Sequence, residues 1–253
     1  MEAAANQKAN IEVAEDSDSF AEKAVRHFVD GANQAIKAKD KFFIAICGGK
    51  TPCSFFEHLG KNKPALKLPW QKIHLFWVDE IIILPNQKGK NFQLAEDTFL
   101  SKIKIPKENV HQIPTQFCDF QVSAYSYEKT IRDVFQIQQG RIPEFDLIIL
   151  GMDCEGTTGS LFPDSYAAFD EEDLACVVYD LEQRRNRITL TRSVLRAALH
   201  LLVLVSGREK ASILKQVLTS EPDEVRYPIH ILWPVLDKIT WLVDKQAAAE
   251  INV

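Results

Sequence analysis

The sequence lacks the features that define several large protein classes. Its longest apolar stretch, Val194–Val205, contains Arg196 and His200 and is far shorter than the roughly 20 residues that a membrane helix needs. The first ten residues have no apolar core of the kind found in secretory signals. No basic block is present, and 30 Lys and Arg face 35 Asp and Glu, which gives a net charge of −5. We therefore expect neither a membrane nor a nucleic acid among the partners.

Paired cysteines and closely spaced metal ligands are also missing. The six histidines form no H-E-x-x-H or H-x-H pattern, and the five cysteines form no C-x-x-C pair. The cysteines are Cys47, Cys53, Cys118, Cys154 and Cys176. An odd number of unpaired cysteines favours a reduced, cytoplasmic protein in which each is a small buried hydrophobe. We expect no metal site and no cofactor.

Short, wholly apolar segments alternate with helical patterns along the chain. Strands are predicted at residues 42–46, 73–78, 145–150, 187–190, 201–205 and 239–243. Helices are predicted over 20–36, from about 51, 192 and 208, and in the Ala-rich C-terminal segment. Strands without polar alternation indicate a parallel sheet that is covered on both faces. The fold class is therefore α/β, with one Rossmann-like domain at residues 12–253 after a flexible tail at residues 1–11.

Polar residues follow several of these strands. In an open parallel sheet, ligands bind beyond the carboxyl ends of the strands. The segments expected at that edge are residues 47–52, 79–80, 151–158 and 206–210. Their convergence predicts one site, and it is a stronger signal than any single segment.

The first of these segments has the properties of a phosphate-binding turn. Gly48 and Gly49 let backbone N–H groups turn toward an anion, and a helix N-terminus with Thr51 follows. Lys50 lies in the same turn, and Lys210 begins a helix at the same edge. A tight turn without ligand, with Lys210 as a solvated surface residue, is the alternative interpretation.

Carboxylates follow two of the strands. Asp79 and Glu80 are adjacent in a strand, so only one of them faces the site, where it can serve as a base. Glu155 lies in a Gly-flanked loop that permits close approach of a substrate. The alternatives are a turn or helix-cap carboxylate at residues 79–80 and a solvated Glu155.

Several motifs, in order from about residue 12 to the C-terminus, resemble those of the 6-phosphogluconolactonase family. Residues 47–52 resemble S-G-G-S-T-P, and residues 77–80 resemble W-V-D-E-R, with Asn91 at an S-N-Y/F position. Residues 145–163 resemble F-D-L-x-x-L-G-M-G-x-D-G-H-T-A-S-L-F-P. Residues 187–191 match R-I-T-x-T, and residues 207–211 match G-x-E-K-A. The resemblance implies a sugar-phosphate isomerase/lactonase type of α/β fold.

The same resemblance implies a set of site residues. The expected catalytic residues are Asp79, Glu155 and Thr157. The residues expected to bind the sugar phosphate are Gly48, Gly49, Lys50, Thr51, Asn91, Thr158, Ser160, Arg187 and Lys210.

The sequence departs from the family at residues that carry its chemistry. Thr157 occupies the position of the family histidine, which is the usual candidate for the acid/base, and a threonine hydroxyl does not titrate near neutral pH. Ile81 replaces an arginine, Glu155 an aspartate and Asp153 a glycine.

Three activities remain open from the sequence. The favoured one is hydrolysis of 6-phospho-D-glucono-1,5-lactone to 6-phosphogluconate in the pentose phosphate pathway, at a reduced rate, with Asp79 or Glu155 as base. The second is sugar-phosphate binding without catalysis. The third, which the Phe162-Pro163 loop ending and the missing histidine disfavour, is an isomerase or deaminase.

Overall fold

The chain folds around a parallel seven-stranded sheet in a computed structural model that describes residues 9–83, 89–163, 169, 172–179 and 185–252. The strand order is β1-β10-β9-β6-β2-β3-β5, and neighbouring strands pair in parallel. The strands are β1 (Asn10–Ala14), β2 (Phe42–Ile46), β3 (Ile73–Trp77), β5 (Val110–His111), β6 (Leu147–Gly151), β9 (Leu201–Val205) and β10 (Ile239–Asp244). The chain moves outward from β2 through β3 and β5, and then returns to β6 on the other side of β2. Such a reversal opens a crevice at the carboxyl ends of the central strands.

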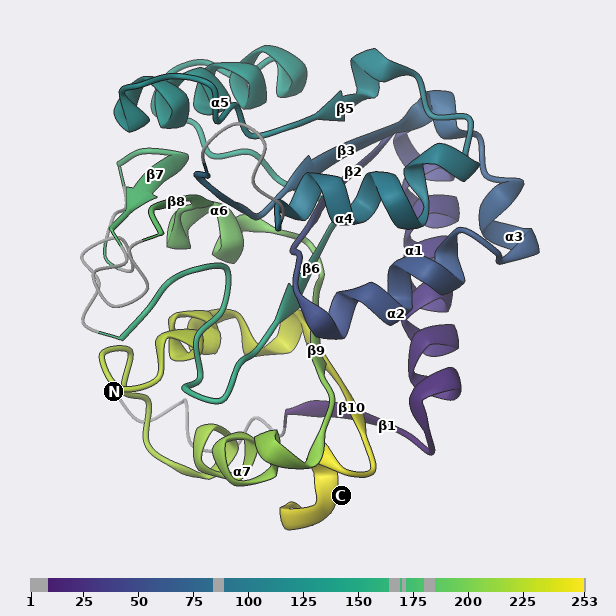
Figure 1. The fold of residues 1–253 in the computed structure, drawn as a ribbon, viewed down its shortest axis with the longest axis vertical. Helices are drawn as coiled ribbons and strands as arrows, with labels where there is room; N and C mark the ends of the chain where they lie inside the picture. Colours follow the sequence, from purple (N-terminus) through teal and green to yellow (C-terminus); the bar gives the residue numbers. More distant parts are fainter. Residues whose placement is uncertain (1–8, 84–88, 164–168, 170–171, 180–184, 253) are drawn as a thin grey trace.

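Helices cover both faces of this sheet. In Figure 1, α1, α2 and α3 lie on one side, whereas α6 lies on the other with β7 and β8. The α-helices are α1 (Ser17–Lys39), α2 (Lys50–Leu59), α3 (Lys63–Leu66), α4 (Asn91–Thr98), α5 (Phe120–Phe135), α6 (Arg192–Ala197) and α7 (Ala211–Thr219). The 3₁₀ helices are η1 (Trp70–Lys72), η2 (Leu100–Lys102), η3 (Lys107–Asn109), η5 (Arg208–Lys210), η6 (Pro228–Lys238) and η7 (Ala247–Glu250).

Helix α1 shows how the sequence sets the ends and orientation of an element. Asp16 and Ser19 form a reciprocal capping box at its start, and the helix ends where Asp40 adopts the left-handed conformation with φ 63°. Phe20, Phe28 and other apolar residues on one face of the helix are buried. The helix therefore packs its apolar face onto the sheet and leaves its polar face in water.

A second, three-stranded sheet extends from the first at Val78. It contains β4 (Asp79–Ile81), β8 (Arg187–Leu190) and β7 (Ala175–Val178), paired antiparallel in that order. The strand predicted at 187–190 therefore exists but belongs to this sheet. The carbonyl of Val78 accepts a hydrogen bond from Leu190 N at 2.8 Å, and Val78 N donates to Ile46 O at 2.8 Å. Val78 is thus the residue at which the two sheets join.

Several boundaries differ from the predicted ones. Strand β1 begins at Asn10, inside the expected tail, because Ile11 and Val13 pack against the core; residues 1–8 lie outside the described part. The C-terminal segment forms the short 3₁₀ helix η7. Cys118 and Cys154 are exposed, contrary to expectation. Among the described residues, no helix is long and apolar enough to cross a membrane.

Candidate active site

The turn after β2 lies at the centre of the crevice and begins α2. Gly49 adopts φ 108°, a conformation that side chains disfavour, and it forms the N-terminal boundary of α2. A Cβ added to Gly48 would lie 1.9 Å from Asn91 Oδ1, so only glycine fits there. The backbone N–H groups at this helix N-terminus are therefore available to an anion. The side chain of Lys50 lies outside the described part of the structure.

A positively charged side chain lies beside this turn. Lys210 Nζ donates to Thr51 Oγ1 at 3.1 Å, and burial lowers the pKa of Lys210. The segment just before Lys210 is held by Asp244 at the end of β10. Asp244 accepts hydrogen bonds from Ser206 Oγ at 2.6 Å and from Gly207 N at 3.0 Å. Three strand ends thus bring a hydroxyl, a cation and a helix N-terminus together, as a phosphate site requires.

The carboxylate of Asp79 lies at the junction of the two sheets. Ser160 Oγ donates to its Oδ2 at 2.5 Å, and Arg187 Nη1 lies 3.7 Å from the same oxygen. Burial raises the pKa of Asp79, while the hydroxyl of Ser160 and the charge of Arg187 lower it. Asp79, Ser160 and Arg187, which are distant in sequence, therefore form one charged cluster.

The two adjacent carboxylates of β4 face opposite sides, as predicted. Glu80 accepts hydrogen bonds from backbone N–H groups at the start of α4, whereas Asp79 faces Ser160. Asn91 Nδ2 donates to the backbone oxygen of Asp79 at 2.8 Å. Asn91 therefore lies against both the backbone of Asp79 and the turn at Gly48.

The loop after β6 is organised by Asp153, one of the residues that depart from the family pattern. Its Oδ1 accepts from Glu155 N and Thr157 N, both at 2.9 Å, and its backbone oxygen accepts from Gly156 N at 3.4 Å. These three N–H groups are therefore occupied within the loop. Glu155 is exposed, whereas Thr157 is buried.

Three buried polar atoms of the site have no hydrogen-bond partner within the part of the chain that the structure describes. They are Thr157 Oγ1, Thr158 Oγ1 and Arg187 Nε. A buried polar atom without a partner is costly, and in an active site it is available to water or substrate. The two threonines lie in the same loop as Ser160, which donates to Asp79. Arg187 Nε belongs to the guanidinium group that faces Asp79.

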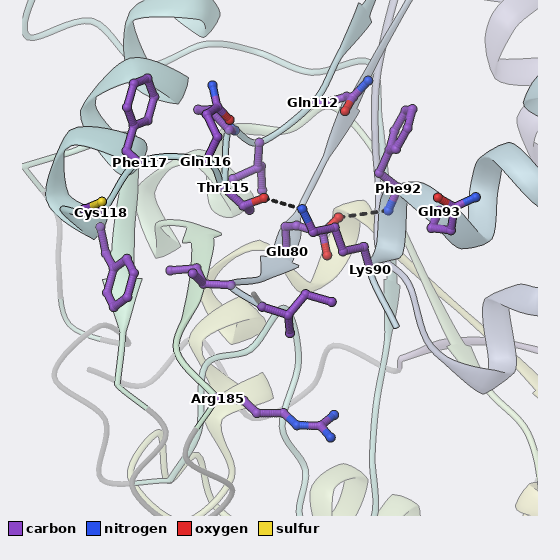
Figure 2. Close-up of a pocket in the computed structure, with 15 residues that line it drawn as sticks. Glu80, Lys90, Phe92, Gln93, Gln112, Thr115, Gln116, Phe117, Cys118 and Arg185 are labelled. Atoms are coloured by element: carbon purple, nitrogen blue, oxygen red, sulfur yellow. Dashed lines mark hydrogen bonds between the residues drawn. The ribbon is translucent and has the colours of Figure 1, made fainter. Parts of the chain in front are cut away.

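A separate pocket of about 1140 Å³ lies on the Glu80 side of β4. Figure 2 shows Glu80, Lys90 and Phe92 on one side of it and Thr115, Gln116 and Phe117 on the other. Lys90 Nζ donates to Thr115 Oγ1 at 2.6 Å. The pocket and the Asp79 cluster are thus separated by strand β4.

The structure brings most of the predicted site residues into one region. Lys210 joins Thr51, Ser160 and Arg187 join Asp79, and Asn91 joins Gly48. Ile81, which replaces a family arginine, lies opposite Arg187 in the β4–β8 ladder. The position of Glu80 at the start of α4 corresponds to the helix-cap alternative for residues 79–80. The roles of Asp153 and Asp244 were not predicted, because their partners include backbone N–H groups that only folding brings near.

Comparison with known families and proteins gives consistent matches over nearly the whole chain. A family model described as glucosamine-6-phosphate isomerases/6-phosphogluconolactonase matches residues 15–241. The 6-phosphogluconolactonase of Nostoc sp. is 33% identical over 97% of this chain and 100% of its own. That of Chlamydia pneumoniae is 32% identical over 90% of this chain and 85% of its own. The crystal structure of 6-phosphogluconolactonase from Thermotoga maritima superimposes with a TM-score of 0.78 and 28% identity, over 94% of this chain and 100% of that one.

Proposed function

Because the chain belongs to the glucosamine-6-phosphate isomerase/6-phosphogluconolactonase family, we propose that it hydrolyses 6-phospho-D-glucono-1,5-lactone to 6-phosphogluconate in the pentose phosphate pathway. One observation supports this proposal: a turn with the groups that a phosphate site needs lies at the same edge of the sheet as a buried carboxylate cluster. The first comprises the turn at Gly48 and Gly49 with Thr51 and Lys210. The second comprises Asp79, Ser160 and Arg187.

The reaction needs a base, donors for an oxyanion and a held phosphate. In our proposal, Asp79 removes a proton from water as the water oxygen bonds to C1 of the lactone. The carbonyl oxygen becomes an oxyanion, which Arg187 Nε and the hydroxyl of Thr158 stabilise. The bond from C1 to the ring oxygen then breaks, and the ring oxygen takes up the proton that Asp79 removed from water, which restores the carboxylate. The phosphate remains at the N-terminus of α2 throughout.

Asp79 fits the role of base better than Glu155 does. Burial raises the pKa of Asp79, and a carboxylate with a raised pKa is a stronger base when it is ionised. Glu155 is exposed and lies in the loop that Asp153 holds. Because Thr157 replaces the family histidine, the proposed rate is lower than with a histidine base; general acid–base catalysis typically contributes about 10²–10⁴-fold.

The proposal is tested by measuring lactone hydrolysis against the spontaneous reaction. Wild type is expected to exceed the spontaneous rate, and Asp79→Asn is expected to lower kcat by about 10²–10⁴-fold, because the amide cannot accept the proton. Glu155→Gln is the matched control, and its kcat is expected to stay within about threefold of wild type because Glu155 is exposed.

Two outcomes would contradict the proposal. A larger loss in Glu155→Gln than in Asp79→Asn would assign the base to the loop. If wild type binds 6-phosphogluconate but is no faster than the spontaneous reaction, the chain is a sugar-phosphate binder that has lost catalysis.

A further inference from the structure

Glu80 points away from the sugar-phosphate site and accepts three backbone hydrogen bonds. Its Oε1 accepts from Ile81 N and Asn91 N, both at 2.8 Å, and its Oε2 accepts from Phe92 N at 2.9 Å. Figure 2 shows the bond to Phe92 at the wall of the pocket. Both carboxylate oxygens are thus used, and they tie β4 to the first turn of α4.

These three hydrogen bonds of Glu80 are called the Glu80 clamp below. The clamp holds Asn91, which lies against both parts of the site. Asn91 is the first residue of α4, and its Nδ2 donates to the backbone oxygen of Asp79 at 2.8 Å. Its Oδ1 lies so close to Gly48 that a Cβ there would be 1.9 Å away. A shift of Asn91 therefore changes the separation between the carboxylate cluster and the phosphate-binding turn.

We propose that Glu80 is a positioning residue that acts through Asn91 to fix the distance between Asp79 and the Gly48 turn. This inference rests on the function proposed above, since it assigns Glu80 a part in aligning the lactone with its base. A misplacement of about 1 Å in an active site costs up to about 10²-fold in rate, so small movements of Asn91 are sufficient.

Holding α4 with a buried carboxylate lowers the stability of the fold when Glu80 is ionised. The pKa of Glu80 is raised to about 7, mainly by burial and further by the charge of Asp79. The hydrogen bonds from the three backbone N–H groups oppose this shift, because they lower the pKa. A carboxylate whose pKa is raised by folding costs stability once it ionises, as the pH rises from about 4.5 toward 7. The ionised carboxylate is the better acceptor for these three N–H groups, because protonation turns one of its oxygens into a donor. The geometry is therefore maintained at a cost in stability.

Asp146 provides a matched control for this role. It is also a buried carboxylate that accepts from a backbone N–H, that of Phe43 at 2.8 Å, and it pairs with Lys39 at 2.8 Å. It precedes β6, at the opposite end of the strands from the site. Its replacement by asparagine removes comparable interactions from the fold without touching Asn91.

The test compares Glu80→Gln, Asn91→Ala, their double variant and Asp146→Asn. Glu80→Gln is expected to lower kcat/KM by about 10- to 100-fold, because glutamine has one oxygen acceptor where the clamp needs two. Asp146→Asn is expected to lose stability without this loss. The double variant is expected to be no worse than Asn91→Ala alone, since Glu80 acts through Asn91. The side-chain NH₂ resonances of Asn91 are expected to move in Glu80→Gln and to stay in place in Asp146→Asn.

Two results would overturn the proposal. Multiplicative losses in the double variant would show that Glu80 acts independently of Asn91. Unchanged Asn91 resonances in Glu80→Gln would show that the clamp does not position this side chain. The resonance measurement needs no turnover, so failure of the positioning role is distinguished from failure of the proposed lactone hydrolysis, which wild type alone would reveal.

Discussion

Lys210 and Thr51 are 159 residues apart in the sequence, yet they share a hydrogen bond beside the turn after β2. Burial lowers the pKa of Lys210, and the nearby acidic groups, among them Glu209 and Asp153, raise it. A buried cation next to a hydroxyl and a helix N-terminus gains most when a dianion binds there. At the scale of single residues, we therefore expect this pair to contribute to phosphate affinity.

Replacing either member of this pair is expected to weaken sugar-phosphate binding. Lys210→Met and Thr51→Val should each cost about 1–3 kcal/mol in the affinity for 6-phosphogluconate, measured by calorimetric titration. Lys215→Met is the control, because Lys215 lies on the neighbouring helix α7 and is exposed. Equal affinities in wild type and both site variants would place the phosphate elsewhere.

How far individual site residues can be predicted depends on what they contact. Thr51, Asp79 and Lys210 follow predicted strands, so the chain order alone locates them at one edge of the sheet. Asp153 and Asp244 also follow predicted strands, but the sequence gives no signal for their partners. Each is one of many carboxylates in the sequence, and its partners are backbone N–H groups whose direction is set by the finished fold.

At the scale of elements, five of the seven main-sheet strands were predicted, namely β2, β3, β6, β9 and β10, whereas β1, β5 and the second sheet were not. The predicted strand at 187–190 is confirmed, but its apolar pattern does not distinguish a parallel sheet from an antiparallel one. Strand β4 is three residues long and contains two carboxylates, so no hydrophobic period identifies it.

The edge strand β5 is held to β3 by a pair of histidines among aromatic rings. His74 Nδ1 and His111 Nε2 lie 3.2 Å apart, and His111 stacks on Phe76 with ring centroids 4.3 Å apart. Burial lowers the pKa of both histidines, that of His111 to about 4. The charge of Lys41 lowers the pKa of His74 further, and a charged His74 lowers that of His111. The pair therefore packs in its neutral form.

This pair is expected to make the fold less stable in acid. Because the pKa of His111 falls from 6.5 to about 4 on folding, its contribution is complete above pH 6.5 and is lost as the pH falls toward 4. The loss is at most about 3 kcal/mol. His111→Phe should flatten the dependence of the urea midpoint on pH between 7.5 and 5, whereas the exposed His200→Gln should leave it unchanged. A slope in His111→Phe equal to that of wild type would rule out this source.

At the scale of the whole molecule, one apolar core joins both sheets. Buried residues form a continuous cluster that includes Trp241 on β10, Trp77 on β3 and Ile188 on β8. The 3₁₀ helix η6 adds Ile229, Ile231 and Leu232 to the same cluster. Because this core is continuous, we expect no part of the fold to lose its packing independently of the rest.

We therefore expect the chain to unfold in a single transition. Tryptophan fluorescence, which reports on Trp77 and Trp241 at distant strands, and far-ultraviolet circular dichroism should give the same urea midpoint. Separated midpoints would indicate that the three-stranded sheet, or the β1 side of the main sheet, forms a separate unit.

The opposite orientation of Asp79 and Glu80 has a consequence for how this protein can change in evolution. Insertion or deletion of one residue between Trp77 and Asp79 would exchange the two side chains, so that Glu80 would face the site and Asp79 would face the pocket. With the roles proposed above, we expect such a change to disable both residues at once, beyond repair by a single substitution. Changes of length are therefore excluded from this short stretch, while substitutions that keep its length, such as the isoleucine at position 81, remain accessible to selection.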